Sequence, residues 1–128
     1  MPHNVRKKIT IMLSMDNGRK HPIIPIDHGN HLAVHPHYPY SRQYTITHIE
    51  SGKKVRWNLP RFVALRMLEL LDGDSRWKKI MNEGKGCEGS WALNRAVALA
   101  QQNAEAEYLL TEDLKRGKGG MRDAQYST

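Results

Sequence analysis

Residues 44–72, YTITHIESGKKVRWNLPRFVALRMLELLD, contain the change of pattern that decides the fold. In the first part of this stretch Tyr44, Ile46 and His48 alternate with threonines and Ile49, which is typical of a β-strand. A Glu-Ser-Gly turn at 50–52 and a return strand at 53–57 complete a predicted hairpin. From residue 58 the apolar spacing becomes helical, so we expect a hairpin that is followed directly by a helix.

The start of the chain also has the pattern of a hairpin. Ile9, Ile11 and Leu13 occupy alternate positions, and the run stops at an Asn-Gly pair, residues 17–18, which favours a tight turn. The return strand, over residues 19–26, contains two prolines that cannot donate a backbone hydrogen bond. We therefore expect this strand to be short and irregular, or to lie at a sheet edge.

A third strand is predicted around Leu32 and Val34. These two side chains share one face, and His31, Ala33 and His35 share the other. Residues 36–40 contain two prolines and are expected to form a loop.

The second half of the chain predicts helices. Asn58 is a plausible N-cap of the helix that runs to residue 72, and Gly73 follows its end. That helix is apolar around most of its circumference, which indicates either burial in the core or a partner. Asp74 or Ser75 can cap a short helix through residues 77–81, and a long helix should run from Ser90 to about Lys115. The expected core face of the long helix is Leu93, Val97, Ala100, Ala104 and Tyr108.

These elements predict an α+β fold, with a small antiparallel β-sheet made of two hairpins in the N-terminal half and packed by two or three C-terminal helices. Residues 1–116 are expected to form a single domain, and residues 117–128 a flexible, disordered basic tail. The single cysteine, Cys87, excludes an internal disulfide. The sequence shows no signal peptide and no long apolar run, so the cytoplasm is the expected location, that of the host if a phage encodes the chain.

Charge is the broadest indication of a partner. The chain has 20 Lys and Arg against 13 Asp and Glu, a net charge of +7, which favours a polyanion such as DNA or RNA, free or in a nucleoprotein complex. Tyr38, Tyr40, Tyr44 and Trp57 are available to stack on bases. The predicted nucleic-acid-binding residues are Lys7, Lys8, Arg19, Lys20, Lys53, Lys54, Arg56, Lys115, Arg116 and Lys118.

Histidines are concentrated between residues 21 and 37. His28, His31, His35 and His37 are candidate ligands for zinc or another transition metal, since two imidazoles in His-x-His can converge on one ion. Histidines in loops that form local hydrogen bonds are the alternative interpretation. A metal-dependent nuclease of the histidine-asparagine-histidine kind would need a helix after its hairpin, but prolines and a β-pattern follow instead.

The piece YTITHIESGKKV at 44–55, together with the apolar helix after it, resembles a hairpin–helix unit of small phage and prophage proteins. This resemblance covers a minor part of the chain and implies no role for any residue. It suggests a phage-type accessory protein. Our leading hypothesis is a non-enzymatic basic protein that contacts nucleic acid. The alternatives are a protein that binds and inhibits a host enzyme or defence complex, as anti-CRISPR proteins do, and a metal-dependent hydrolase at residues 28–37.

Overall fold

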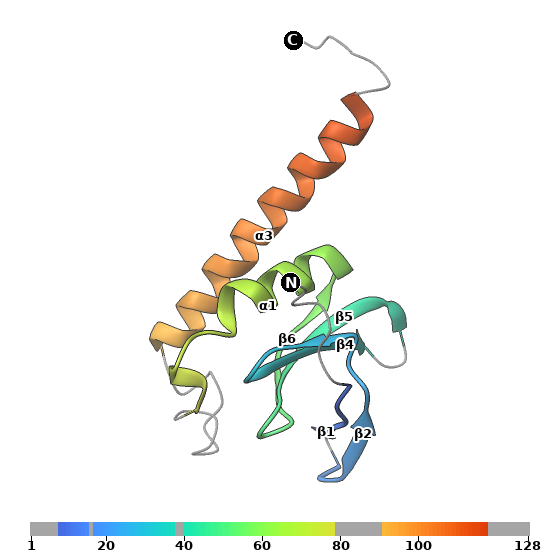
Figure 1. The fold of residues 1–128 in the computed structure, drawn as a ribbon, viewed down its shortest axis with the longest axis vertical. Helices are drawn as coiled ribbons and strands as arrows, with labels where there is room; N and C mark the ends of the chain where they lie inside the picture. Colours follow the sequence, from blue (N-terminus) through green and yellow to red (C-terminus); the bar gives the residue numbers. More distant parts are fainter. Residues whose placement is uncertain (1–7, 16, 38–39, 79–90, 118–128) are drawn as a thin grey trace.

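The computed structural model describes residues 8–15, 17–37, 40–78 and 91–117, and it has an α+β fold (Figure 1). Its helices are α1 (Arg61–Leu71) and α3 (Trp91–Gly117). Its strands are β1 (Ile11–Ser14), β2 (Lys20–Ile23), β3 (Asp27–His28), β4 (Leu32–His37), β5 (Tyr40–His48) and β6 (Lys54–Leu59). The predicted fold class is confirmed, but the strands form two sheets and not one. From residue 118 the predicted basic tail lies outside the described residues.

The larger sheet has the strand order β3-β4-β5-β6, and every neighbouring pair is antiparallel. In its central pair Leu32 lies opposite His48, and Val34 lies opposite Ile46. The hairpin predicted for residues 44–57 is present as β5 and β6, and Gly52 in its turn has a φ of +73°. Glycine is suited to this turn because a side chain makes positive φ costly.

The loop predicted for residues 36–40 is wrong at both of its ends. Pro36 lies inside β4 opposite Tyr44, and Tyr40 begins β5. A proline is tolerated at this point because β3 pairs only with Ala33 and Val34, so β4 has no strand on that side at Pro36. The register shifts between Pro36 and His37, where the regular pairing stops.

The smaller sheet is the predicted N-terminal hairpin. Ile11 lies opposite Ile23 and Ser14 opposite Lys20. Gly18 in the turn has a φ of +81°, and the Asn17 side chain accepts a hydrogen bond from the Arg19 amide. The return strand β2 is short, as expected, and ends before Pro25.

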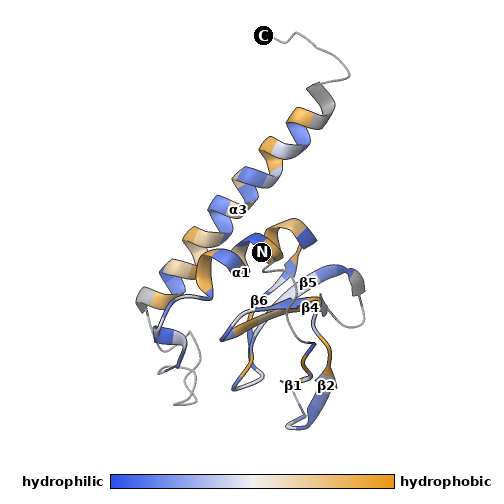
Figure 2. Cartoon of the chain, viewed as in Figure 1, coloured by the Kyte–Doolittle hydropathy of each residue, from blue (hydrophilic) through white to orange (hydrophobic). Residues whose placement is uncertain are grey.

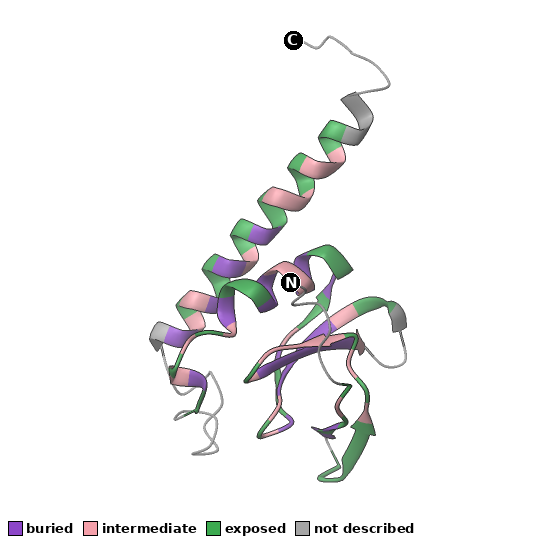
Figure 3. Cartoon of the chain, viewed as in Figure 1, coloured by how far each residue is buried: buried purple, intermediate pink, exposed green. Residues whose placement is uncertain are grey.

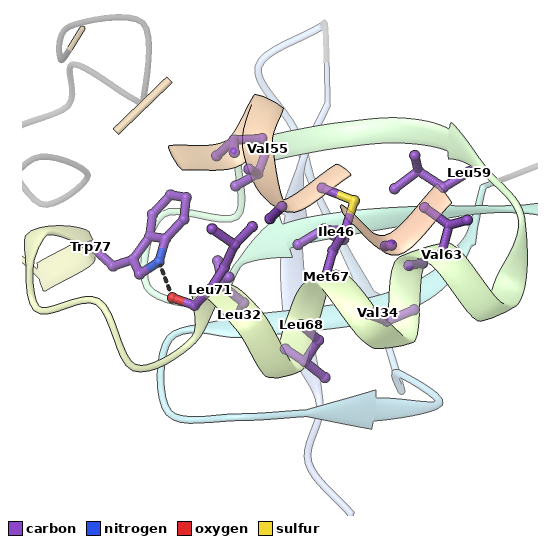
Figure 4. Close-up of a cluster of buried hydrophobic side chains, with 14 of the residues drawn as sticks. Leu32, Val34, Ile46, Val55, Leu59, Val63, Met67, Leu68, Leu71 and Trp77 are labelled. Carbon is purple, nitrogen blue, oxygen red and sulfur yellow. Dashed lines mark hydrogen bonds between the residues drawn. The ribbon is translucent and has the colours of Figure 1, made fainter. Parts of the chain in front are cut away.

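The two faces of the larger sheet are covered by different parts of the chain (Figures 1 and 2). Leu32, Val34 and Ile46 pack against α1, α3 and Trp77 in the main core (Figure 4). Ala33 and Ile49 belong to a smaller cluster with residues of β1 and β2. Because successive side chains of a strand point to opposite faces, the sheet lies between the helices and the N-terminal hairpin. The side chains of α1 that are fully buried in the main core are Val63, Ala64, Met67, Leu68 and Leu71.

The start of α1 differs from the prediction. Pro60 occupies the N-cap position, while Asn58 belongs to β6 and has a φ of +60°. Asparagine is one of the few residues other than glycine that adopts this conformation readily. Downstream, Asp74 accepts a hydrogen bond from the Arg76 amide and caps a helical turn at residues 76–78, as expected. The rest of the predicted short helix, from residue 79, lies outside the described residues.

The Asp72 side chain connects the end of α1 to the turn between β3 and β4. Its carboxylate accepts backbone hydrogen bonds from Asn30 at 2.7 Å, His31 at 2.8 Å and Leu32 at 2.9 Å. Hydrogen bonds to an ionised acceptor are stronger than those between neutral groups. The contact therefore fixes the position of α1 relative to the edge of the sheet.

The long helix α3 extends beyond the sheet (Figure 1). Its predicted core face is correct: Leu93, Val97, Ala100 and Ala104 are buried, and Tyr108 packs against the core. In the part of its C-terminal half whose side chains are described, residues 105–114 are all exposed or half-buried (Figure 3). Within the described part of the chain, no helix has the length and apolar character needed to cross a membrane.

Candidate nucleic-acid interface

Two positively charged side chains lie over aromatic rings on the β5–β6 hairpin and at the start of α1. The Lys54 Nζ atom is 5.3 Å from the centroid of the Trp57 ring system. The Arg61 Cζ atom is 6.0 Å from the centroid of the Tyr44 ring. Both separations are within the range of a cation–π contact. Each contact therefore holds a positive charge close to the face of an aromatic ring.

The backbone explains why these residues meet. Lys54 and Trp57 belong to β6, which lies at one end of the sheet, and Tyr44 in β5 lies opposite Leu59 at the end of β6. Arg61 follows two residues later as the first residue of α1. Arg42, two positions before Tyr44 in β5, is exposed. We call Arg42, Tyr44, Lys54, Trp57 and Arg61 the hairpin surface.

Three of these five residues were predicted from the sequence, Lys54 as a cation and Tyr44 and Trp57 as stacking residues. Arg42 and Arg61 were missed. Its position two residues before Tyr44, a predicted stacking residue, could have indicated Arg42. Arg61 could be identified only from the structure, because its contact with Tyr44 depends on how the chain turns from β6 into α1.

A second group of cations gathers where the N-terminal hairpin meets the β5–β6 turn. The Lys20 ammonium donates to the Ser14 hydroxyl at 3.2 Å, and that hydroxyl donates to the Ser51 carbonyl at 2.9 Å. The Ser14 amide also donates to the Gly52 carbonyl at 2.9 Å. These bonds bring the exposed Lys20 close to the turn that carries Lys53. Arg19, next to Lys20 in the chain, is also exposed.

The remaining predicted cations do not all join these two groups. Arg56 is half-buried in β6, and its Nε atom is buried without a hydrogen-bond partner. Lys8 is exposed just before β1. Lys115 and Arg116 lie near the end of α3, far from the N-terminal hairpin (Figure 1), and their side chains are not among those described. Lys7 and Lys118 lie outside the described residues.

Those of the proposed metal-ligand histidines whose side chains are described have other partners. The His35 ring is buried, and its Nδ1 atom donates to the Pro36 carbonyl at 2.9 Å, while its Nε2 atom accepts from the Thr47 hydroxyl at 2.7 Å. The His28 Nδ1 atom donates to the Gly29 carbonyl at 3.1 Å. Carbonyl acceptors fix the tautomer of both rings. The side chain of His37, the last residue of β4, lies outside the description.

His31 takes part in an unpredicted contact with Glu50 and His48. The His31 Nδ1 atom is 3.2 Å from the Glu50 Oε2 atom, and the His48 Nε2 atom is 3.2 Å from the Glu50 Oε1 atom. The carboxylate therefore bridges two imidazoles. Even so, no group of three or more His, Cys, Asp or Glu side chains in the described part of the chain is arranged to hold a metal ion.

His48 itself is a core residue. It is fully buried, its ring centroid lies 6.1 Å from that of Trp77, and its Nδ1 atom accepts from the Ser51 amide at 3.3 Å. Burial lowers the pKa of His48, the nearby His31 lowers it further, and Glu50 acts in the opposite direction. The net effect favours a neutral ring. Alternation with Ile46 could have indicated that His48 points into the core.

No protein-family model, no curated protein and no solved structure matches the chain.

Proposed function

We propose that the chain is a non-enzymatic basic protein that binds nucleic acid, free or within a nucleoprotein complex, through the hairpin surface. The observation that carries this proposal is the pair of cation–aromatic contacts, Lys54 over Trp57 and Arg61 over Tyr44. A net charge of +7 supports it, because a polyanion is then attracted from a distance. The cytoplasm, where nucleic acids are accessible, is the location we propose.

The chemistry of the hairpin surface suits contacts with phosphates and base faces. Trp57 is 47% exposed, so a base can stack on its indole while the Lys54 ammonium moves to a neighbouring phosphate. Arg42 in β5 and Arg61 at the start of α1 are also exposed and can contact further phosphates. Stacking and phosphate contacts do not read base edges, so the proposed binding tolerates many sequences.

Fluorescence anisotropy with labelled single-stranded and double-stranded DNA and RNA, measured over a range of salt concentrations, tests the proposal. We expect binding at low salt that weakens steeply as salt is added, because each phosphate contact releases counterions. No binding to any of these probes at low salt would overturn the proposal.

Matched variants test whether the hairpin surface is the site. Trp57→Ala should weaken binding about tenfold and Trp57→Phe much less, since a phenyl ring still stacks. Lys54→Gln should lower the steepness of the salt dependence by about one phosphate contact, whereas Lys54→Arg should not. Lys8→Gln removes the same charge next to the smaller sheet and serves as the control. Equal effects of Lys8→Gln and Lys54→Gln would contradict a specific hairpin site.

A protein-binding inhibitor or adaptor of a host enzyme or defence complex is the second candidate function. It needs an exposed apolar patch, and α3 has one at Leu109 and Leu110, which are 63% and 62% exposed. We do not extend the proposal to a metal-dependent hydrolase.

A further inference from the structure

The face of α3 that points away from the core has a regular pattern of its own. Its exposed residues follow a spacing of alternately four and three positions, which is the spacing of a coiled-coil seam. Leu99 is 46% exposed and Leu109 is 63% exposed, although both are large apolar side chains. We call these residues the outer stripe: Arg95, Leu99, Gln102, Ala106, Leu109 and Asp113.

The outer stripe is on the opposite side of α3 from the residues that hold the helix to the core. Leu93, Val97, Ala100 and Ala104 face α1 and the sheet, and the wheel positions of the stripe lie about half a turn away from them. α1 and the sheet occupy one side of α3 (Figure 1), and exposed residues recur along the helix (Figure 3). Hydrophobic residues also recur from turn to turn along the C-terminal half of α3 (Figure 2).

The charges at the two ends of the stripe indicate what covers it. Arg95 lies at the N-terminal end and Asp113 at the C-terminal end. When two copies of α3 pair in parallel, each charge meets its own copy, which is unfavourable. When they pair antiparallel, Arg95 meets Asp113 of the partner at both ends of the interface.

We propose that the outer stripe binds a second copy of this chain, with the two α3 helices antiparallel. Centring the two-fold axis level with Ala104 places Arg95 opposite the partner's Asp113, Leu99 opposite the partner's Leu109, and Gln102 opposite the partner's Ala106. Each of these pairs occurs twice, as the symmetry of an isologous dimer requires. A nucleic acid is a poorer occupant, because Glu105 and Asp113 are exposed on this part of α3.

Sedimentation equilibrium of the full chain over a range of concentrations tests the proposal. We expect a monomer–dimer equilibrium in the wild-type protein. Arg95→Asp and Asp113→Arg should each weaken the dimer about tenfold, because each places two like-charged pairs in the interface. The double variant restores opposite charges at both ends, so its dissociation constant should return to within about threefold of the wild-type value.

Folding of the variants is expected to persist. Arg95→Asp adds a negative charge near the N-terminal end of α3 and Asp113→Arg a positive charge near its C-terminal end, and both suit the helix dipole. Leu109→Glu should abolish the dimer, whereas Leu70→Glu, at an exposed leucine of α1, should not. Circular dichroism checks the helix content of each variant.

Two results would overturn the proposal. One is a wild-type chain that stays monomeric up to high concentration, even if its leucines then capture a different protein. The other is a dimer that the single charge reversals weaken but the double variant does not restore, because that result excludes the antiparallel register.

Discussion

Gly29 and Asp72 lie so close together that a Cβ atom at residue 29 would overlap the Asp72 carboxylate. The contact brings together two turns that are far apart in the sequence, one between β3 and β4 and one after α1. It leaves the carboxylate free to accept the amides of Asn30, His31 and Leu32. Because residue 29 has no side chain, Asp72 at the end of α1 can form its hydrogen bonds with the turn at the edge of the sheet.

Gly29→Ala should lower the free energy of unfolding by about 2–3 kcal/mol, because the added methyl group displaces a carboxylate that holds three amides. Gly29 does not have a positive φ, so alanine itself should cause no backbone strain there. Urea denaturation measures the effect.

A double-mutant cycle with Asp72→Ala isolates the contact. Asp72→Ala alone should cost a similar amount, about 2–3 kcal/mol, through the lost amide hydrogen bonds. In that background Gly29→Ala should cost less than about 0.5 kcal/mol, because the methyl group no longer meets a carboxylate. Additive effects would show that residue 29 matters for a reason other than Asp72.

The free energy of unfolding should fall as the solution is acidified from about pH 7 to about pH 5, and His48 should be one cause. Burial lowers the pKa of His48 in the folded state, whereas in the unfolded chain it is close to 6.5. At a pH above both pKa values the ring is neutral in the folded and the unfolded state, and protonation of His48 then costs no stability. Below about 6.5 the unfolded chain takes up the proton first, so stability is lost as pH falls.

Three variants assign this pH dependence. His48→Gln should flatten the pH dependence of unfolding, even though it lowers stability at every pH. Glu50→Gln should steepen it, because the Glu50 charge raises the pKa of His48 and so limits the shift. His21→Gln, at an exposed histidine of β2, is the matched control. It should leave unchanged the part of the pH dependence of unfolding that His48 causes. An unchanged slope in His48→Gln would assign the pH dependence to other groups.

Trp77 should be one of the most sensitive positions in the core. It is fully buried and its indole N–H donates to the Leu71 carbonyl at 2.8 Å (Figure 4). Trp77→Ala should cost about 4 kcal/mol through the cavity it leaves, and Trp77→Phe about half as much. Because the Trp77 ring shields His48, Trp77→Ala should also reduce the pH dependence of unfolding. Thermal and urea unfolding at two pH values measures both effects.

Periodicity predicted the elements of this fold because the sheet has two differently buried faces. Leu32 and Val34 enter the core under the helices, while Ala33 joins the cluster with β1. Two predictions were wrong, the loop at Pro36 and the N-cap at Asn58. Both errors arose because the neighbours of these residues in space cannot be read from the sequence around them. Pro36 is accepted in β4 because β3 is short, and Asn58 lies within β6 with a positive φ and does not cap α1.

The candidate site was less predictable than the fold. Sequence indicated Lys54 and Trp57, since they are close along one strand. The second contact, Arg61 over Tyr44, depends on the turn from β6 into α1, which no local pattern contains. Crowding of the histidines along the sequence suggested convergence on one ion, whereas among the described rings His35 pairs with Thr47 and His31 with Glu50.

The two glycines with positive φ should respond very differently to alanine. Gly18 has open space around it, so Gly18→Ala should cost only the strain of a left-handed backbone, about 1 kcal/mol. At Gly52 the added methyl group would also overlap the backbone carbonyl of Met12, which cannot move without shifting β1. Gly52→Ala should therefore cost about 3 kcal/mol.

Hydrogen exchange locates the damage that Gly52→Ala causes. The Ser14 amide donates to the Gly52 carbonyl, so its exchange should become much faster in Gly52→Ala, while exchange in α1 should change only as far as global stability does. Gly18→Ala should leave the Ser14 amide protected, because a methyl group at residue 18 meets no other atom and does not touch the contact between Ser14 and Gly52. Equal acceleration in both variants would mean that the N-terminal hairpin opens as a unit, independently of its contact with the β5–β6 turn.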